Sequence, residues 1–265
     1  MPKYFDVGAA GQTGPERDEQ IAGLAAALSA AKKIAFLTGA GMSTDSGIPD
    51  FRSTTGIYSV ASEEIFSIDY FVEDPDRFYS VFASFYRGMT DAKPNSGHLA
   101  IAELERRCGK DVEVVTQNID GLHCVAGSTK VREIHGSLLH ASCMKCERCY
   151  DESYFREDMR AGRTPKCQCG GVLKPDVVFY GEELPTSEFN AARRAMWETQ
   201  LLVVAGTSLQ VYPAAGLPRD CDAGAPFVVI NKTPTPLDLQ ASLVYYGGIG
   251  EILPQAVALV PDKSA

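Results

Sequence analysis

The chain has 265 residues and a formal net charge of −9, with 45% hydrophobic and 22% charged residues. This length can bury one large core, or one large and one small, and the composition is unlike that of disordered or collagen-like chains. The negative charge argues against binding nucleic acid through bulk electrostatics and is compatible with basic peptide partners.

The first 17 residues are rich in glycine, proline and charge and have no apolar core of signal-peptide length. We expect residues 1–17 to be a flexible lead-in. No apolar run in the sequence reaches the ~18 residues of a membrane span. We therefore expect a cytoplasmic protein that does not bind membranes, and of prokaryotic origin because no basic cluster of the nuclear type occurs.

An amphipathic helix is predicted from Asp18 to Lys33. Acidic residues begin this segment and lysines end it, as the helix dipole favours. Its apolar residues recur at intervals of three and four: Ile21, Leu24, Ala25, Leu28 and Ala31.

A short apolar run, Ile34 to Leu37, predicts a strand buried on both faces of a parallel sheet. Gly39 and Gly41 follow, and such a turn aims backbone N–H groups at an anion such as a pyrophosphate. The dehydrogenase fingerprint would place a third glycine at Thr44, so hydride transfer is disfavoured. The alternative is a glycine turn that only tightens the packing of a strand on a helix.

Residues 55–94 are rich in aromatic residues at helical spacing, which we interpret as an inserted helical lobe with its own packing. A second helix is predicted from Pro94 to Gly109. His98 lies in the first turn of that helix, where we expect a structural hydrogen bond.

Polar residues follow the next two predicted strands. Val112 to Thr116 runs into Gln117, Asn118 and Asp120, and Val131 to Ile134 ends at His135. Because ligands bind at the carboxyl ends of strands in open α/β sheets, these side chains are candidates for a binding site. His135 is a candidate general base, although a structural histidine or a capped turn would give the same pattern.

Five cysteines fall within 27 residues, and two pairs among them predict a metal site. Four thiolates favour one structural zinc over a catalytic metal. The second pair is one residue closer than usual, so Cys149 or His140 remains an alternative ligand. The expected ligands are Cys143, Cys146, Cys167 and Cys169.

Further apolar runs predict strands that end in small or polar residues. Leu201 to Ala205 precedes Gly206, and Phe227 to Ile230 precedes Asn231. Val177 to Tyr180 and Leu243 to Tyr246 are two more such runs. Strands that alternate with helices predict an α/β fold with a doubly wound parallel sheet.

Together these motifs resemble the sirtuin family, in its bacterial type. The match runs in order from about Gly39 to Gly250 and comprises GAGMSTDSGIPDFRS, TQNIDGLH, the HG pair, the two cysteine pairs, VVFYGE, GTSLQVYP and Asn231. The resemblance implies a Rossmann-type NAD-binding domain in residues 18–54, 95–139 and 173–258, a helical insertion in 55–94, and a zinc-binding lobe in 140–172.

The resemblance also implies residue roles. His135 would act as general base, assisted by Asn118 and Asp120. The peptide cleft would be formed by Val178, Tyr180, Gly181 and Glu182 on one side and Val211 on the other. NAD would be held by Gly39, Ala40, Gly41, Ser43, Phe51, Arg52, Gln117, Asn118, Ile119, Asp120, Gly206, Thr207, Ser208, Asn231, Gly248 and Ile249.

The implied activity is NAD-dependent removal of acetyl or other uncharged acyl groups from protein lysines, with nicotinamide and O-acyl-ADP-ribose as products. Acylated proteins or peptides would be the partners, and we expect a monomer. Two rivals remain open: transfer of ADP-ribose from NAD to protein, and a non-enzymatic NAD-sensing module. The second gives no reason for a histidine at the ribose.

Overall fold

The computed structural model describes residues 3–6, 15–54, 56–59, 62–222 and 224–263. Seven parallel strands form the larger sheet, in the order β1-β10-β9-β8-β2-β3-β4. Their bounds are β1 Lys3–Asp6, β2 Lys33–Thr38, β3 Asp111–Thr116, β4 Val131–Glu133, β8 Leu201–Ala205, β9 Phe227–Asn231 and β10 Leu243–Tyr246. Because all seven run parallel, their carboxyl ends meet at one edge of the sheet.

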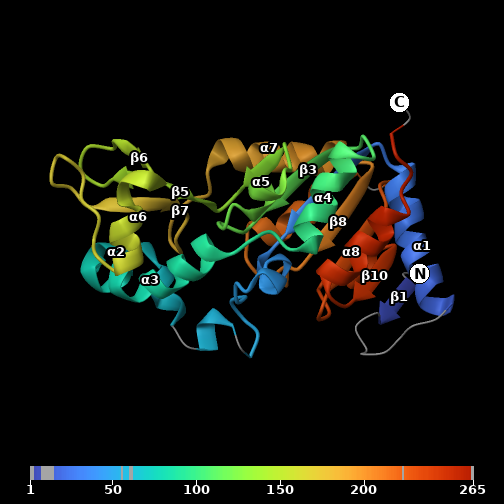
Figure 1. Ribbon diagram of the computed structural model, residues 1–265, viewed down its shortest axis with the longest axis horizontal. Helices are drawn as coiled ribbons and strands as arrows, with labels where there is room; N and C mark the ends of the chain where they lie inside the picture. The colour runs from blue at the N-terminus through green and yellow to red at the C-terminus, as the bar shows by residue number, and fades with distance from the viewer. Residues whose placement is uncertain (1–2, 7–14, 55, 60–61, 223, 264–265) are drawn as a thin grey trace.

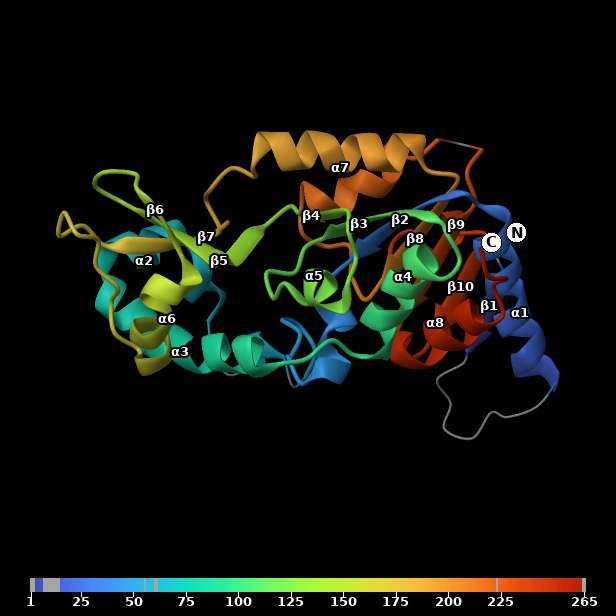
Figure 2. The ribbon, with the colours of Figure 1, turned by 45° about the horizontal axis from the view of Figure 1, so that its top comes forward.

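Helices cover both faces of this sheet, as the doubly wound prediction requires (Figure 2). One face packs on α1 (Pro15–Ala30), α4 (Ser96–Arg106) and α8 (Ile249–Ala258). The other face packs on α7 (Thr186–Glu198) and the 3₁₀ helix η5 (Ala214–Asp220). The central strand β8 is buried along its whole length, which explains its uninterrupted apolar sequence.

A second, smaller unit lies at the far end of the molecule, on the left of Figure 1. Its antiparallel sheet has the order β6-β5-β7, with β5 Gly136–Cys143, β6 Cys149–Asp151 and β7 Leu173–Val177. Three helices pack on it: α2 (Ile68–Glu73), α3 (Pro75–Asp91) and α6 (Glu152–Ala161). Aromatic residues of α3, including Phe78 and Phe82, form the centre of this separate core.

The structure differs from the sequence prediction at two strands. Residues 3–6 are not part of a flexible lead-in but pair with β10 as the edge strand, where Tyr4 stacks on Tyr246. Residues 1–2 and 7–14 of that lead-in lie outside the described residues, and residues 15–17 form the start of α1. Residues 173–177, expected in the Rossmann-type domain, form β7 of the smaller sheet, because they pair with β5. Of the predicted strand Val177 to Tyr180, only Val177 lies in a strand.

The segment between the cysteine pairs also differs from the expectation of a lobe with little core. Its helix α6 buries Phe155 and Met159 against α3. The helical insertion and the cysteine lobe therefore share one core. Among the described residues, no helix combines the length and apolarity needed to cross a membrane.

Candidate active site

The glycine turn predicted after β2 forms a 3₁₀ helix, η1 (Ala40–Met42), at the carboxyl edge of the large sheet. It packs directly against the turn after β8, where Gly41 donates its N–H to the Gly206 carbonyl at 2.8 Å. Gly206 has a φ of +66°, and a Cβ there would lie 2.3 Å from the backbone nitrogen of Met42. Side chains are therefore excluded from this contact, which leaves backbone groups to face a ligand.

A hydrogen-bonded network joins the turn after β2 to the turn after β3. Ser43 donates to the Asp120 carboxylate at 2.6 Å, and the Asn118 amide donates to Ser43 Oγ and to the Gly39 carbonyl, both at 3.1 Å. Asn118 is 8% exposed, so its orientation is fixed by these two bonds. Predicted residues from two separate motifs thus meet at one point.

His135 follows β4 and lies beside the same network. Its Nδ1 is 2.9 Å from the Gln117 carbonyl oxygen, which can only accept, so Nδ1 carries the proton and Nε2 keeps its lone pair. Burial lowers the pKa of His135 from its ordinary value of 6.5, although the hydrogen bond to Gln117 opposes the change. The imidazole is therefore neutral at pH 7 and can accept a proton through Nε2.

The turn after β8 reaches the turn after β3 through side chains. Gln117 donates from Nε2 to Thr207 Oγ1 at 3.0 Å, and Ser208 follows, partly exposed. Ile249, at the start of α8, approaches Gly206, and Gly248 is the N-cap of that helix. Asn231, at the end of β9, donates to the Thr233 carbonyl, so its amide is held by its own turn.

The loop after η2 (Thr44–Ser46) connects the glycine turn to the smaller unit. The Phe51 ring packs edge-on against Phe66, with ring centroids 6.0 Å apart. Arg52 pairs with Glu63 at 3.5 Å, and its guanidinium lies 3.4 Å from the Tyr180 hydroxyl. Two predicted site residues, Arg52 and Tyr180, therefore meet directly.

The predicted peptide-binding segment leaves β7 and runs past His135. Val178 donates its N–H to the His135 carbonyl at 2.9 Å, and Tyr180 bridges to Ser67 in the manner of a parallel strand. Gly181 turns the chain with a φ of +94°. Val211 precedes η5, and no hydrogen bond in the described part of the chain joins it to this segment.

The Glu182 carboxylate is held by two contacts within the protein. Its carboxylate accepts from the Phe179 N–H at 2.8 Å and lies 2.9 Å from the Lys174 ammonium. Lys174 is 9% exposed, donates to the Val177 carbonyl and lies 4.3 Å from the centre of the Phe179 ring. No role was predicted for Lys174, because Pro175 and Asp176 follow it and the mixed stretch carries no local signal of a buried lysine.

Two buried histidines, His98 and His123, lie next to the segments that carry the network of Ser43, Asn118 and Asp120. The expected structural hydrogen bond of His98 is present, since its Nδ1 accepts from the Asn95 N–H at 3.3 Å in a capping box. His123, in α5 (Leu122–Ala126), lies 3.0 Å from Thr38 Oγ1, and its ring is 4.8 Å from that of His98. Neither His123 nor Thr38 was singled out as a functional residue from the sequence.

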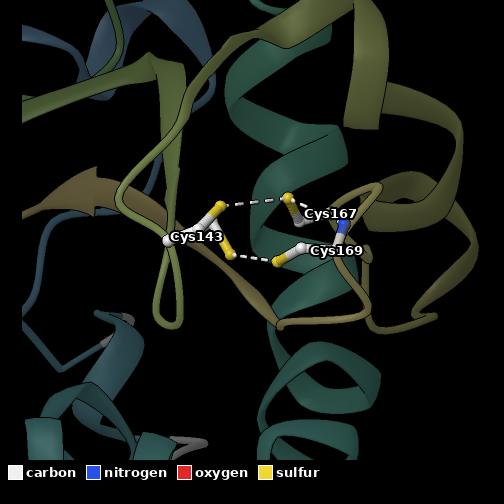
Figure 3. A group of neighbouring side chains, drawn as sticks. Cys143, Cys167 and Cys169 are labelled. Carbon is white, nitrogen blue, oxygen red and sulfur yellow. Dashed lines mark hydrogen bonds between the residues drawn. The ribbon is translucent and has the colours of Figure 1, made fainter.

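The four predicted cysteines converge in the smaller unit (Figure 3). Their sulfur atoms all lie within 4.8 Å of one another, with 3.5 Å between Cys143 and Cys169 and 3.6 Å between Cys146 and Cys167. A tetrahedral zinc with bonds of about 2.3 Å separates its sulfurs by roughly 3.8 Å. Gly171 completes the cradle, because a Cβ there would lie 2.6 Å from Cys143 Sγ. The donor set fits one structural zinc.

The alternative ligands lie outside this cluster. Cys149 Sγ is 3.7 Å from the Asp176 carboxylate, and His140 pairs with Asp151 at 3.3 Å. Each is exposed and has a partner elsewhere on the small sheet.

Comparisons with known proteins agree with this geometry. The family described as "Sir2 family" matches residues 39–213. An NAD-dependent protein deacetylase of Clostridium perfringens is 40% identical over 250 residues, which are 91% of this chain and 99% of that protein. One from Sulfolobus acidocaldarius is 42% identical and covers 87% of this chain and 91% of its own length.

Solved structures show the same architecture. A Sir2 enzyme superimposes with a TM-score of 0.85 at 39% identity, covering 92% of this chain and 98% of its own. A Sir2 structure with a deacetylated p53 peptide and 3'-O-acetyl ADP ribose has a TM-score of 0.82 at 36% identity, covering 90% of this chain and 98% of its own.

Proposed function

The chain belongs to the Sir2 family, and on that premise we propose that it removes acetyl groups from protein lysine side chains in an NAD-dependent reaction. Nicotinamide, O-acetyl-ADP-ribose and free lysine are the products. The likeness to a Sir2 structure that holds a deacetylated peptide and an acetylated ADP-ribose supports this reaction. A Sir2 complex with p53 peptide and NAD+, 36% identical to this chain, supports both substrates.

The observation that carries the proposal is the state of His135. Its Nδ1 proton is committed to the Gln117 carbonyl, and burial keeps the ring neutral. A neutral Nε2 beside the carboxyl edge of the sheet is suited to take a proton from a ribose hydroxyl of bound NAD. A non-enzymatic NAD-sensing module has no use for a base held in this form.

The remaining residues position the two substrates. The backbone of Gly39, Ala40 and Gly41 would bind the pyrophosphate, and Arg52 would exchange Glu63 for the phosphates or ribose. Asn118 and Asp120, locked together through Ser43, would orient the nicotinamide ribose and its carboxamide. The acylated peptide would add as a strand beside Val178, Tyr180 and Gly181, with Val211 opposite.

We extend the proposal to a preference for uncharged acyl groups. Relatives specialised for acidic acyl groups resemble one another in a tyrosine three residues before an arginine in the helical lobe, and here Ser84 precedes Arg87 at that spacing. Arg87 is exposed and donates to the Arg160 carbonyl, away from the site. Arg52 lies at Tyr180 but is assigned to the phosphates or ribose of NAD, so an acidic acyl group would be buried without a cationic partner, at a cost of several kcal/mol.

The acyl preference is tested on one peptide carrying either acetyl-lysine or succinyl-lysine. We expect kcat/KM to be at least ~10²-fold higher for the acetylated form, the equivalent of about 2.7 kcal/mol. A succinyl preference would show that a cation reaches the distal carboxylate.

The activity itself is tested by incubating the protein with an acetylated peptide and NAD. Release of nicotinamide together with equal amounts of deacetylated peptide and O-acetyl-ADP-ribose is the expected result. Label from NAD fixed on the protein, with the acetyl group left on the peptide, would instead identify an ADP-ribosyltransferase.

We propose a cytoplasmic location, because four thiolates persist as metal ligands where thiols stay reduced. We also propose that the chain acts as a monomer and binds neither nucleic acid nor membranes. The net charge of −9 opposes binding to polyanions such as nucleic acids and anionic membrane surfaces.

A further inference from the structure

We propose that the Tyr150 hydroxyl donates a hydrogen bond to the zinc-ligating thiolate of Cys167 and thereby slows the release of zinc. Tyr150 lies in β6, opposite Ala141 of β5, and its side chain is half-buried beside the cysteine cluster. Its hydroxyl oxygen is 3.1 Å from Cys167 Sγ. The inference rests on the zinc site and does not depend on the deacetylation reaction.

The direction of this hydrogen bond follows from a second contact. The backbone N–H of Gln168 donates to the Tyr150 hydroxyl oxygen at 3.4 Å, so the oxygen already accepts one proton. The single O–H proton of the tyrosine is then left for Cys167. A cysteine bound to zinc has lost its proton and can only accept, which leaves the hydroxyl as the donor.

The tyrosine is held in place for this role. Its ring stacks on Tyr154, with ring centroids 4.3 Å apart, and Tyr154 donates from its own hydroxyl to the Lys166 carbonyl at 3.2 Å. Arg148 fixes the loop between the last two cysteines by donating to the Gln168 side chain at 2.7 Å. The Tyr150 ring is therefore fixed in an orientation that directs its hydroxyl toward Cys167.

The hydrogen bond from Tyr150 matters because the zinc–thiolate cluster carries excess negative charge. Four thiolates around one Zn²⁺ carry a net charge of −2, which hydrogen bonds to sulfur disperse. Backbone N–H groups supply two such bonds, from Lys145 to Cys143 and from Cys169 to Cys167, both at 3.4 Å. Among the hydrogen bonds described, Tyr150 supplies the one side-chain O–H at the cluster. Its loss would leave more negative charge on the Cys167 sulfur and remove one of the contacts that hold this ligand in place, so the ligand would exchange more readily.

The test measures transfer of zinc from the full-length, zinc-loaded protein to the metallochromic chelator 4-(2-pyridylazo)resorcinol. The variant is Tyr150→Phe, which removes the hydroxyl and keeps the ring. We expect zinc release at least 10-fold faster than from the parent, the lower end of the effects of partners that bond to metal ligands. The matched control is Tyr70→Phe, which removes a hydroxyl from a partly buried tyrosine of α2 in the same smaller unit and should release zinc at the parental rate.

A second readout separates the hydrogen bond from a loss of folding. With Co²⁺ in place of zinc, the thiolate-to-metal charge-transfer band should move to longer wavelength in Tyr150→Phe, because Cys167 becomes more electron-rich. Zinc release at the parental rate, together with an unchanged charge-transfer band, in Tyr150→Phe would overturn the proposal. Equal acceleration in Tyr150→Phe and Tyr70→Phe would also overturn it, because the effect would then come from a general loosening of the smaller unit.

Discussion

At the scale of single residues, the proposed reaction requires His135 to be neutral and correctly oriented. We predict that His135→Ala lowers deacetylation by about 10²- to 10⁴-fold, the usual cost of losing a general base, while thermal stability changes little. The base must be unprotonated, so activity is lost as pH falls through its pKa. Burial lowers that pKa, so the midpoint of the acid limb of kcat/KM should lie below 6.5. A variant with the parental rate would remove His135 from the reaction.

The buried pair His98 and His123 predicts a pH dependence of stability. Burial lowers the pKa of His98 to about 4 and that of His123 to about 3, against an ordinary value of 6.5 when unfolded. Below pH 6.5 the unfolded chain binds protons that the folded chain does not. Stability is therefore full above pH 6.5 and falls toward pH 4, by roughly 1.4 kcal/mol per pH unit for each histidine.

The histidine prediction is measured with urea unfolding between pH 7.5 and 4.5. Protonation of the zinc ligands also lowers stability in acid, so the informative quantity is the difference from His123→Gln, which keeps a polar group near Thr38. We expect the variant to lose about half of the slope that the two histidines contribute. Parallel curves for the parent and the variant would show that His123 is not a source of the pH dependence.

Sequence reasoning reached the residues that carry strong chemical signals. Cysteine spacing identified all four members of the cluster, and polar residues after apolar runs led to Asn118, Asp120 and His135. It missed His123, Lys174 and Tyr150, because their importance depends on which residue they meet in space. Tyr150 meets Cys167 across a lobe whose pairing no local pattern specifies.

At the scale of elements, the strands buried on both faces were the most predictable. Leu201–Ala205 and Leu243–Tyr246 have the predicted bounds, because a short uninterrupted apolar run is typical of a strand in a parallel sheet covered by helices. Val177 to Tyr180 was predicted as a strand of the parallel sheet, whereas the strand begins at Leu173, ends at Val177 and pairs with β5. Lys174, Pro175 and Asp176 interrupt its apolar pattern, so no local signal marked its bounds. Lys3–Asp6 was missed because a four-residue edge strand carries little pattern.

The turn after β7 predicts a specific effect on peptide binding. Lys174 bonds Glu182 and the Val177 carbonyl beneath the Phe179 ring. Lys174→Met would leave both acceptors without this donor, at a cost of about 1–3 kcal/mol. Because the turn lies between β7 and the proposed peptide strand, we expect KM for the peptide to rise several-fold while KM for NAD stays near parental.

The matched control for this prediction is Lys166→Met, which removes an exposed lysine of the same lobe. It should leave both KM values unchanged. If Lys174→Met raised the two KM values equally, the lysine would stabilise the whole protein and not the peptide side of the site.

At the scale of the whole molecule, the chain folds around separate cores joined at the site. The large sheet is packed by α1, α4 and α8 on one face and by α7 and η5 on the other, whereas α3, α6 and the small sheet share a core of their own. The chain crosses from β4 of one sheet to β5 of the other at His135. The proposed base thus lies where the two units meet, and the hydrogen bond from the Val178 N–H to the His135 carbonyl connects it to the smaller unit.

This arrangement predicts what removal of zinc does. A chelator should loosen the smaller unit first, because the binding energy of a four-thiolate site is largely folding energy of the segment that carries it. Hydrogen exchange is expected to accelerate in β5, β6 and α6 while β2 and β8 keep their protection, since their buried faces pack on helices of the larger unit. Activity should fall together with protection of the smaller unit, because that unit carries Val178 and Tyr180.

Cys167→Ala should reproduce both effects without a chelator. The parent should bind one zinc per chain and the variant less than one. Simultaneous loss of protection in both sheets would mean that the two cores unfold as one, and full zinc content in Cys167→Ala would refute the ligand set.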